Sequence, residues 1–391
     1  MDGVDRKEAS VRPVGVVTPT RAQTLWTVQV MRGVAALMVV VGHSQSVVVG
    51  IVATGNGGFA RSALVPWGAG VDLFFVISGF IIVHASTRLF GRQDARAEFL
   101  RRRLVRVVPL YWLMTSLFLL LLAAATWKGG DRFPDARAIL ASYLFVPADT
   151  YGDGRLFPVL DLGWTLNYEM FFYALLALVV TMPRERALTA MGIVLAVALA
   201  AGTVLPGPSA LWFWTRPIML DFGLGVAVGA LVGRGIVLPN GVRILLAIAG
   251  AALLLADPYH IFDGPIGTTV ANAWPRVVRA GVPVAVVLAA AVLGPEPALP
   301  RVVSPLTKVG DASYSLYLFH PFALIAIEKC AQKLPFVRGV SGWLLVAATV
   351  VLALVIATLA HRWIERPMTA ALARRFAKPP LMPRTSGVSG E

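Results

Sequence analysis

Apolar runs of about 18 to 22 residues recur from Val28 to the neighbourhood of His361, and each is long enough to cross a hydrocarbon core about 30 Å thick. Of the 391 residues, 57% are hydrophobic and only 14% are charged, whereas a soluble domain carries roughly a quarter of its residues as charges. Lipid therefore surrounds most of the chain. A membrane barrel would show short segments of alternating polarity instead, so the sequence predicts an all-α, polytopic integral membrane protein.

The apolar runs number about ten, and each is a predicted membrane-spanning helix. They cover residues 28–50, 70–87, 104–126, 164–182, 187–205, 217–233, 243–256, 278–294, 312–330 and 343–362. The further apolar stretch 136–147 is too short to span a bilayer and predicts a re-entrant or interfacial helix.

The distribution of positive charge predicts the orientation of these spans. The net charge is +14, which in a soluble protein would suggest a nucleic-acid partner. Lys and Arg collect on the cytoplasmic side of membrane proteins, and with ten spans roughly two thirds of them fall on inner loops and tails. Seven arginines lie between Arg88 and Arg106 alone. We therefore expect both termini in the cytoplasm and no nucleic-acid partner.

The chain divides into three parts at the limits of its apolar region. Residues 1–26 form a polar cytoplasmic segment without the apolar core of a signal peptide. Residues 27–367 form one transmembrane domain, and residues 368–391, with three prolines, predict a disordered cytoplasmic tail. The single cysteine, Cys330, lies in an apolar run, which excludes a disulfide framework and a thiolate metal cluster. We expect no metal.

Ionisable residues inside a span are costly and mark candidate functional sites. The first predicted span carries Arg32 and His43, whose spacing of eleven positions places both on one helical face, about 16 Å apart along the axis. Arg32 lies near the cytoplasmic boundary and His43 well across toward the outside, so one elongated ligand can contact both. The alternative is that Arg32 extends to the lipid head groups while His43 hydrogen-bonds another helix.

Two acidic residues lie in later spans. Asp72 stands at the outer start of the second span, where it could orient or charge-stabilise a histidine, and the nearby Ser78 and Gly79 permit close helix approach. Glu169 lies a few residues into the fourth span, at an outer depth that resembles that of His43. A buried carboxylate pairs or is neutralised, so we expect a polar partner on another span. A role in chemistry or acceptor binding and a structural hydrogen bond both remain open for Glu169.

A basic run, Arg101, Arg102, Arg103 and Arg106, precedes the third span. Guanidinium groups bind phosphate oxygens bidentately, although positive charge here also serves simple orientation. Arg103 and Arg106 are three positions apart on one helical face and nearest the membrane, so we expect these two to bind phosphate.

Two further features allow more than one interpretation. His320 lies in the middle of a span, where a role in a site and a role in packing are equally open. The outer segment 149–161 contains aromatic, acidic and basic side chains. It could bind carbohydrate by stacking and polar contacts, but solvated loops often have this composition.

Several motifs, in one order, resemble the acyltransferase 3 family of integral membrane acyltransferases over about residues 25–367. They are Arg32 with His43, AspLeuPhePheValIleSerGlyPhe, ArgArgArgLeuValArgValValProLeuTyrTrp, TrpThrLeuAsnTyrGlu and SerTyrSerLeuTyrLeuPheHisPro. The wording GlyTrpThrLeuAsnTyrGluMetPhePheTyr is most similar to the branch that acetylates bacterial exopolysaccharides such as succinoglycan.

The resemblance implies a bacterial inner-membrane enzyme that takes an acyl group from coenzyme A in the cytoplasm to a sugar hydroxyl on the far side. It implies that His43 is the catalytic residue and that Arg103 and Arg106 match the family's RxxR element. We therefore expect acetyl-CoA as donor, bound by Arg32, Arg103 and Arg106, and a glycan or lipid-linked oligosaccharide as acceptor.

Two mechanisms fit these residues. His43 could act as a general base on the sugar hydroxyl, with Asp72 or Glu169 holding the imidazole or the sugar, or it could carry the acetyl group transiently. A transporter or flippase for a glycan or lipid-linked sugar is the main alternative in another class, although the sequence shows no inverted repeat.

Overall fold

The computed structural model describes residues 25–55, 57–129, 133–256 and 274–376, and the structural statements below concern these residues. All regular elements within these ranges are helices, which confirms the all-α prediction. The principal helices are α1 (Trp26–Ala53), α2 (Ala69–Ala85), α3 (Ala95–Trp127), α4 (Ala136–Tyr143), α5 (Gly163–Val179), α6 (Arg184–Val204), α7 (Ala210–Trp214), α8 (Met219–Gly233), α9 (Asn240–Leu255), α10 (Trp274–Arg276), α11 (Val282–Val292), α12 (Ser304–Asp311), α13 (Ser313–Lys333), α14 (Gly342–Ala360) and α15 (Arg366–Arg375). Short π-helical turns (Val277–Gly281 and His361–Glu365) join α10 to α11 and α14 to α15, and a 3-10 turn, Pro335–Gly339, precedes α14.

Each predicted span coincides with one of these helices, and the short stretch 136–147 coincides with α4. Within the described ranges, six helical stretches are long and apolar enough to cross a membrane: Trp26–Ala53, Ala95–Trp127, Arg184–Val204, Ala210–Gly233, Trp274–Val292 and Gly342–Arg375. The helices α2 and α9 are apolar but shorter. The chain is therefore a multi-pass membrane protein, while the count of ten spans and the cytoplasmic placement of both termini stay predictions.

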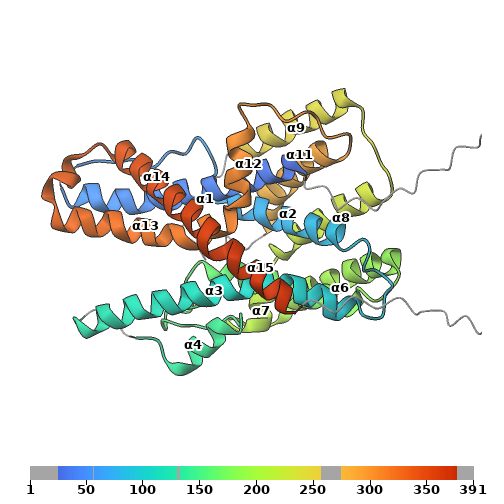
Figure 1. Ribbon diagram of the computed structural model, residues 1–391, viewed down its shortest axis with the longest axis horizontal. Coiled ribbons are helices and arrows are strands. Elements are labelled where there is room, and N and C mark those ends of the chain that lie inside the picture. The colour runs from blue at the N-terminus through green and yellow to red at the C-terminus, as the bar shows by residue number, and fades with distance from the viewer. Residues whose placement is uncertain (1–24, 56, 130–132, 257–273, 377–391) are drawn as a thin grey trace, which may run out of the picture.

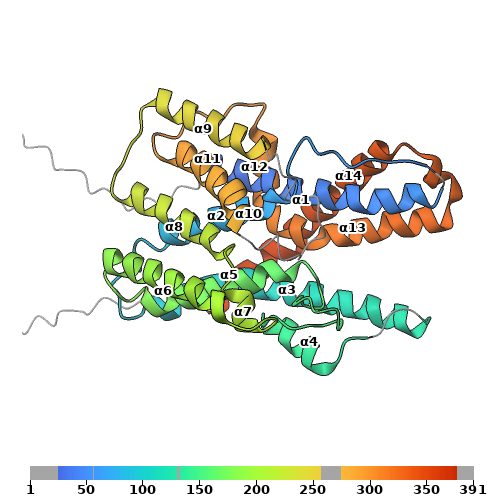
Figure 2. The same cartoon turned by 180° about the vertical axis from the view of Figure 1, so that it is seen from behind.

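The helices form three groups (Figure 1). At one end of the molecule, α1, α13 and α14 lie side by side, and the view from behind shows the same arrangement (Figure 2). At the other end, α2 and α8 pack together and α9 packs on α11. The long helix α3 runs along the opposite side of the molecule, α4 packs against its middle, and α15 crosses to contact α3. Helix α1 contacts α2, α13 and α14 and thereby joins the first two groups.

Helices α1 and α13 run in the same direction. Arg32 and Ser313, both near the amino-terminal ends of their helices, are hydrogen-bonded at 2.8 Å, and farther along the same two helices His43 contacts His320 at 2.8 Å. Two parallel spans require an even number of crossings from one to the other. The predicted topology, in which these helices are the first and ninth spans, has this property.

Helix α2 is held against α8 by glycines. A Cβ atom at Gly225 of α8 would lie 2.8 Å from the backbone nitrogen of Phe80, and one at Gly79 of α2 would lie 3.0 Å from the Cα atom of Phe222. Small residues allow backbones to approach closely in membranes, where van der Waals contact drives helix association. This packing turns another face of α2, with Val71, Phe74 and Ile81, toward the interior.

The carboxyl-terminal helix extends farther than the sequence predicts. Helix α15 ends at Arg375, so residues 368–375 of the predicted disordered tail are helical. The physical reason is composition, because Ala, Leu and Arg are good helix formers and α15 continues directly from α14 through the π turn. The three prolines on which the prediction was based, and the segment 1–24, lie outside the described residues.

We expect Gly225→Ala to destabilise the protein, because the added methyl group meets the backbone of α2 rather than a movable side chain. Overpacking of this kind costs about 1 to 3 kcal/mol, which should appear as a lower midpoint of thermal unfolding in detergent. The matched control is Gly192→Ala in α6, where a Cβ atom meets nothing within 4 Å. Equal midpoints for the two variants would contradict this account of the α2–α8 contact.

Candidate functional site

A cavity of about 90 Å³ lies among α1, α2, α3, α5 and α13. One wall is cationic and consists of Arg32 from α1 with Arg103 and Arg106 from α3. Glu169 from α5 adds one carboxylate, and the face of α2 described above supplies an apolar wall. The structure thus brings together four of the six site residues that the sequence predicts. Three arginines and one glutamate line the cavity, so the lining is net positive and favours an anionic ligand.

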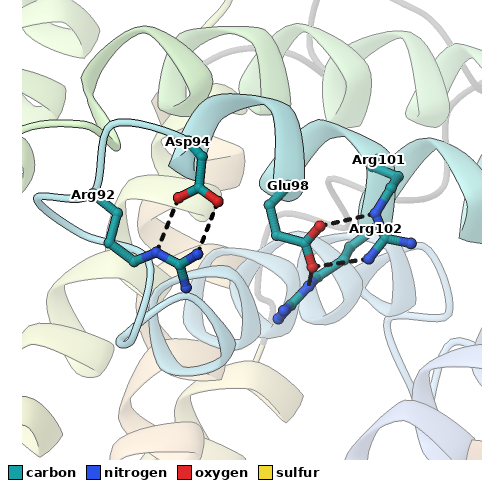
Figure 3. Close-up of polar contacts among 5 residues, drawn as sticks. All are labelled: Arg92, Asp94, Glu98, Arg101 and Arg102. Carbon is teal, nitrogen blue, oxygen red and sulfur yellow. Dashed lines mark hydrogen bonds and ion pairs between the residues drawn. The ribbon is translucent and has the colours of Figure 1, made fainter. Parts of the chain in front are cut away.

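The basic run at the start of α3 is divided between the surface and the cavity. Glu98 accepts hydrogen bonds from Arg101 at 2.8 Å and from Arg102 at 2.6 Å, as Figure 3 shows beside the Arg92–Asp94 ion pair. These two arginines thereby share one carboxylate outside the cavity. Arg103 and Arg106 line the cavity instead, and the binding of phosphate by these two stays a prediction.

The guanidinium of Arg103 lies against two aromatic rings, and its Nε–H group has no hydrogen-bond acceptor within the described ranges. Its guanidinium carbon lies 5.7 Å from the ring centre of Phe99 and 5.9 Å from that of Tyr173. Its Nε atom is buried and has no hydrogen-bond partner among the described residues. A buried donor without a partner costs free energy, and an anionic ligand in the cavity would remove that cost.

Arg32 is oriented by neutral groups. Its guanidinium donates to Ser313 of α13 at 2.8 Å and to Gln29 of α1 at 3.1 Å. In the described part of the chain, no carboxylate lies within ion-pair distance of it. The structure therefore places Arg32 at the cavity with its charge uncompensated by direct contact.

Glu169 lies beside the arginines. Its carboxylate accepts hydrogen bonds from Ser78 of α2 at 3.3 Å and from Tyr173 of its own helix. This is the polar partner expected on another span, but the level differs from the expectation, because Glu169 shares the cavity with Arg32 and not the surroundings of His43. Counting residues from the start of each span assumed that all spans begin at one depth. Helix α1 has 28 residues and α5 has 17, so their ends are staggered.

Asp72 is engaged away from the cavity. Its two carboxylate oxygens accept hydrogen bonds from Arg276 at 2.8 and 2.7 Å, and both side chains are almost completely buried. Asp221 of α8, also fully buried, lies beside this pair. The group ties α2, α8 and α10 together. The structure does not bring Asp72 to His43 by a hydrogen bond, and its predicted part in the chemistry stays a prediction.

His43 meets a second histidine. Its Nδ1 atom lies 2.8 Å from Nε2 of His320 on α13. His320 is fully buried, whereas His43 remains partly exposed. His43 thus does hydrogen-bond another helix, as the simpler interpretation supposed, and its partner is the histidine whose role the sequence left open.

The outer segment 149–161 is organised mainly by internal contacts. The Asp149 carboxylate accepts from the backbone N–H groups of Gly152 and Gly154 at 2.7 and 3.0 Å. Arg155 pairs with Asp153, and this hydrogen bond lowers the pKa of the Asp153 carboxyl below its ordinary value. Binding of carbohydrate by this segment stays a prediction. No cluster of three or more His, Cys, Asp or Glu side chains that could hold a metal ion is found in the described part of the chain.

Sequence reasoning missed several residues of the site. Ser313, which accepts a hydrogen bond from Arg32, and Tyr317 both line the cavity. In the SerTyrSerLeuTyrLeuPheHisPro motif they stand seven and three positions before His320, and that helical spacing was the available signal. Arg276 stands at the start of an apolar run, three positions before Arg279, and an arginine at such a place indicates a buried partner.

Comparison with known proteins identifies the family. The acyltransferase domain profile of the acyltransferase 3 family matches residues 26–362. The chain belongs to this family. It is 34% identical over 331 residues to the exopolysaccharide production protein ExoZ of Rhizobium meliloti (strain 1021), an alignment that covers 79% of this chain and 95% of that protein. No solved structure shows a significant match. The protein is therefore a membrane acyltransferase, which requires an acyl donor and an acceptor.

We expect Arg276→Met to destabilise this acyltransferase more than Asp72→Asn. Loss of the cation leaves two buried carboxylates, and breaking a buried ion pair costs about 3 to 5 kcal/mol. After Asp72→Asn, Arg276 still has the Gly68 carbonyl at 3.2 Å and Asp221 nearby. Thermal unfolding in detergent measures both effects, and equal losses would contradict the assignment of Asp221 to this group.

Proposed function

We propose that this acyltransferase moves an acetyl group from cytoplasmic acetyl-CoA to a hydroxyl group of an extracytoplasmic glycan in exopolysaccharide production. One observation carries the proposal: α1 presents Arg32 to a cationic cavity and His43 to a second site, and α13 holds both side chains. One helix thus connects an anion-binding region with an imidazole about 16 Å farther along its axis. The similarity to a protein named for exopolysaccharide production supports the class of acceptor.

The cavity fits part of such a donor. Coenzyme A carries phosphates, which the guanidinium groups of Arg103, Arg106 and Arg32 can bind by charge-assisted hydrogen bonds. It also carries a thin pantetheine arm, which suits the apolar wall of α2. A volume of about 90 Å³ is below that of sites for drug-sized ligands, about 300 Å³ or more. Only the part of the donor between its phosphates and its thioester is therefore enclosed there.

His43 acts on the acceptor. A sugar hydroxyl is a weak nucleophile, and neutral imidazole can take its proton as the oxygen attacks the thioester carbonyl. The new C–O bond forms, the C–S bond breaks, and the proton passes from His43 to the departing sulfur. Transfer through an acetyl-histidine uses the same residues in two steps. In either route the glycan is on the side of His43 and coenzyme A is on the side of Arg32.

This direction places the protein in the bacterial inner membrane with both termini in the cytoplasm. The arginine-rich start of α3 is then cytoplasmic, as the distribution of positive charge favours. Acetyl-CoA is made and used in the cytoplasm, so the cationic cavity lies on the side of its supply.

His43→Ala should abolish acetylation of the glycan while the protein remains inserted, since loss of a general base typically lowers the rate by about 10² to 10⁴-fold. The measurement is acetyl content of the exopolysaccharide, together with transfer from radiolabelled acetyl-CoA in membranes. His84→Ala, which alters a histidine that packs on Phe80 of its own helix, is the control. Unchanged acetylation in His43→Ala would end this mechanism.

Arg103→Gln and Arg106→Gln should raise the KM for acetyl-CoA by about tenfold or more, because each removes a charged hydrogen-bond donor from the phosphates. Arg102→Gln is the matched control: it lies in the same run but pairs with Glu98 outside the cavity. Purified protein in detergent or liposomes gives the comparison. An equal rise in all three variants would indicate a general effect of charge and would remove the cavity from the proposal.

A further inference from the structure

Helix α13 contains a proline directly after its buried histidine. In an α-helix the N–H group of residue 321 would donate to the carbonyl of residue 317. Proline has no N–H group, so Pro321 leaves the Tyr317 carbonyl without its helical donor. The Nδ1 atom of His320 lies 2.8 Å from this oxygen and 3.3 Å from that of Leu316. The side chain of His320 therefore takes the place that the backbone of residue 321 leaves open.

These contacts determine the protonation of His320. A carbonyl oxygen only accepts hydrogen bonds, so Nδ1 of His320 carries a hydrogen. His320 is fully buried, and no carboxylate pairs with it in the described ranges, so the neutral imidazole is the form that burial favours. A neutral imidazole with hydrogen on Nδ1 has a lone pair on Nε2.

The lone pair on Nε2 of His320 determines in turn which nitrogen of His43 carries a hydrogen. Its Nδ1 atom faces the Nε2 lone pair of His320 at 2.8 Å, so Nδ1 of His43 is the donor. The ring centres are 5.1 Å apart and the planes differ by 15°. The N–N distance plus the distance from each ring centre to its nitrogen equals that separation, so the two ring centres and the two nitrogens lie nearly on one line. The rings therefore meet edge to edge, in nearly one plane. This is the geometry of a linear N–H···N hydrogen bond.

We propose that His320 and Pro321 are positioning residues that fix the tautomer of His43. Because Pro321 has no N–H group, the Tyr317 carbonyl is free to accept a hydrogen bond from Nδ1 of His320. Nε2 of His320 then accepts a hydrogen bond from Nδ1 of His43. The Nε2 atom of His43 is left unprotonated and available to a substrate. This assignment rests on the proposed function for its purpose, since it makes Nε2 the atom that takes the hydroxyl proton, but the tautomer itself is independent of any substrate.

The proton that His43 takes up during the reaction is also released from His43. When Nε2 of His43 accepts the hydroxyl proton, the ring becomes an imidazolium whose Nδ1–H group still donates to His320. The proton leaves from Nε2 to the sulfur of the departing thiolate. His43 is the partly exposed ring of the two, so a substrate can reach it without disturbing His320.

The first test reads the tautomer directly. Protein labelled with ¹⁵N and ¹³C in its five histidines is placed in liposomes without substrate, and solid-state NMR assigns the signals of His43 by their absence in His43→Ala. We expect hydrogen on Nδ1 of His43. Hydrogen on Nε2 would overturn the inference even if acetyl transfer were normal, and an inactive protein with hydrogen on Nδ1 would reject the proposed function alone.

The second test separates positioning from packing. In His320→Gln a side-chain oxygen can still accept from Nδ1 of His43, whereas His320→Leu offers no acceptor. For the leucine variant we expect kcat to fall about 10²-fold or more with an unchanged KM for acetyl-CoA, and for the glutamine variant we expect most of that loss to be recovered. Equal activity of the two variants would show that His320 only fills space.

The third test uses the proline. Pro321→Ala restores an N–H group that competes for the Tyr317 carbonyl and should raise the midpoint of thermal unfolding, because proline is unfavourable inside a helix. At the same time the Nδ1–H signal of His43 should weaken and kcat should fall severalfold. Pro109→Ala is the control, since Pro109 is also inside a helix, and it should leave the tautomer unchanged. An intact tautomer and kcat in Pro321→Ala would overturn the role of the proline.

Discussion

The site depends on the pairing of α1 with α13. Between helices in lipid there is little hydrophobic driving force, so packing and polar contacts decide how the helices align. Here Arg32 bonds to Ser313 and His43 bonds to His320, and both contacts require the same alignment of the two helices. A slide by one turn would break both together. The anion-binding end and the imidazole end of the site are therefore coupled through one register, although each has its own neighbours.

The arginines of this protein differ in whether a carboxylate pairs with them. Glu98 pairs with both Arg101 and Arg102, and Asp72 engages Arg276, so these cations have direct carboxylate partners. Among the residues that line the cavity, Glu169 supplies the one carboxylate beside three arginines. This difference separates structural ion pairs from the residues that we propose to bind the donor better than position in the sequence does. It also explains the combination of a cationic wall and an apolar wall, which suits a donor with phosphates at one end and a thin chain at the other.

The positions of the helices could be predicted from the sequence, but the side-chain contacts between them could not. Length and hydropathy depend on local composition, so the ten apolar segments and α4 were predictable. The partners of Asp72 and His43 stand 204 and 277 positions away, and no local pattern reveals such pairs. The level of Glu169 was misjudged because α1 and α5 differ in length and are staggered. The helical spacing of Ser313, Tyr317 and His320 was a signal that our prediction from the sequence did not use, and the role of Pro321 depends on a hydrogen bond of His320 that no sequence pattern reveals.

The role proposed for the Tyr317 carbonyl bears on how a histidine can act as a general base inside a membrane. In the soluble triads, the outermost member is an aspartate that orients the histidine, and an ionised carboxylate is very costly to keep in hydrocarbon. A peptide oxygen performs the same orienting task without a formal charge. In the mechanism proposed above, the resting assembly of carbonyl and two imidazoles is electrically neutral, and an ion exists there only for the duration of the transfer. A base built in this way can reside within the bilayer without a water-filled vestibule to solvate it.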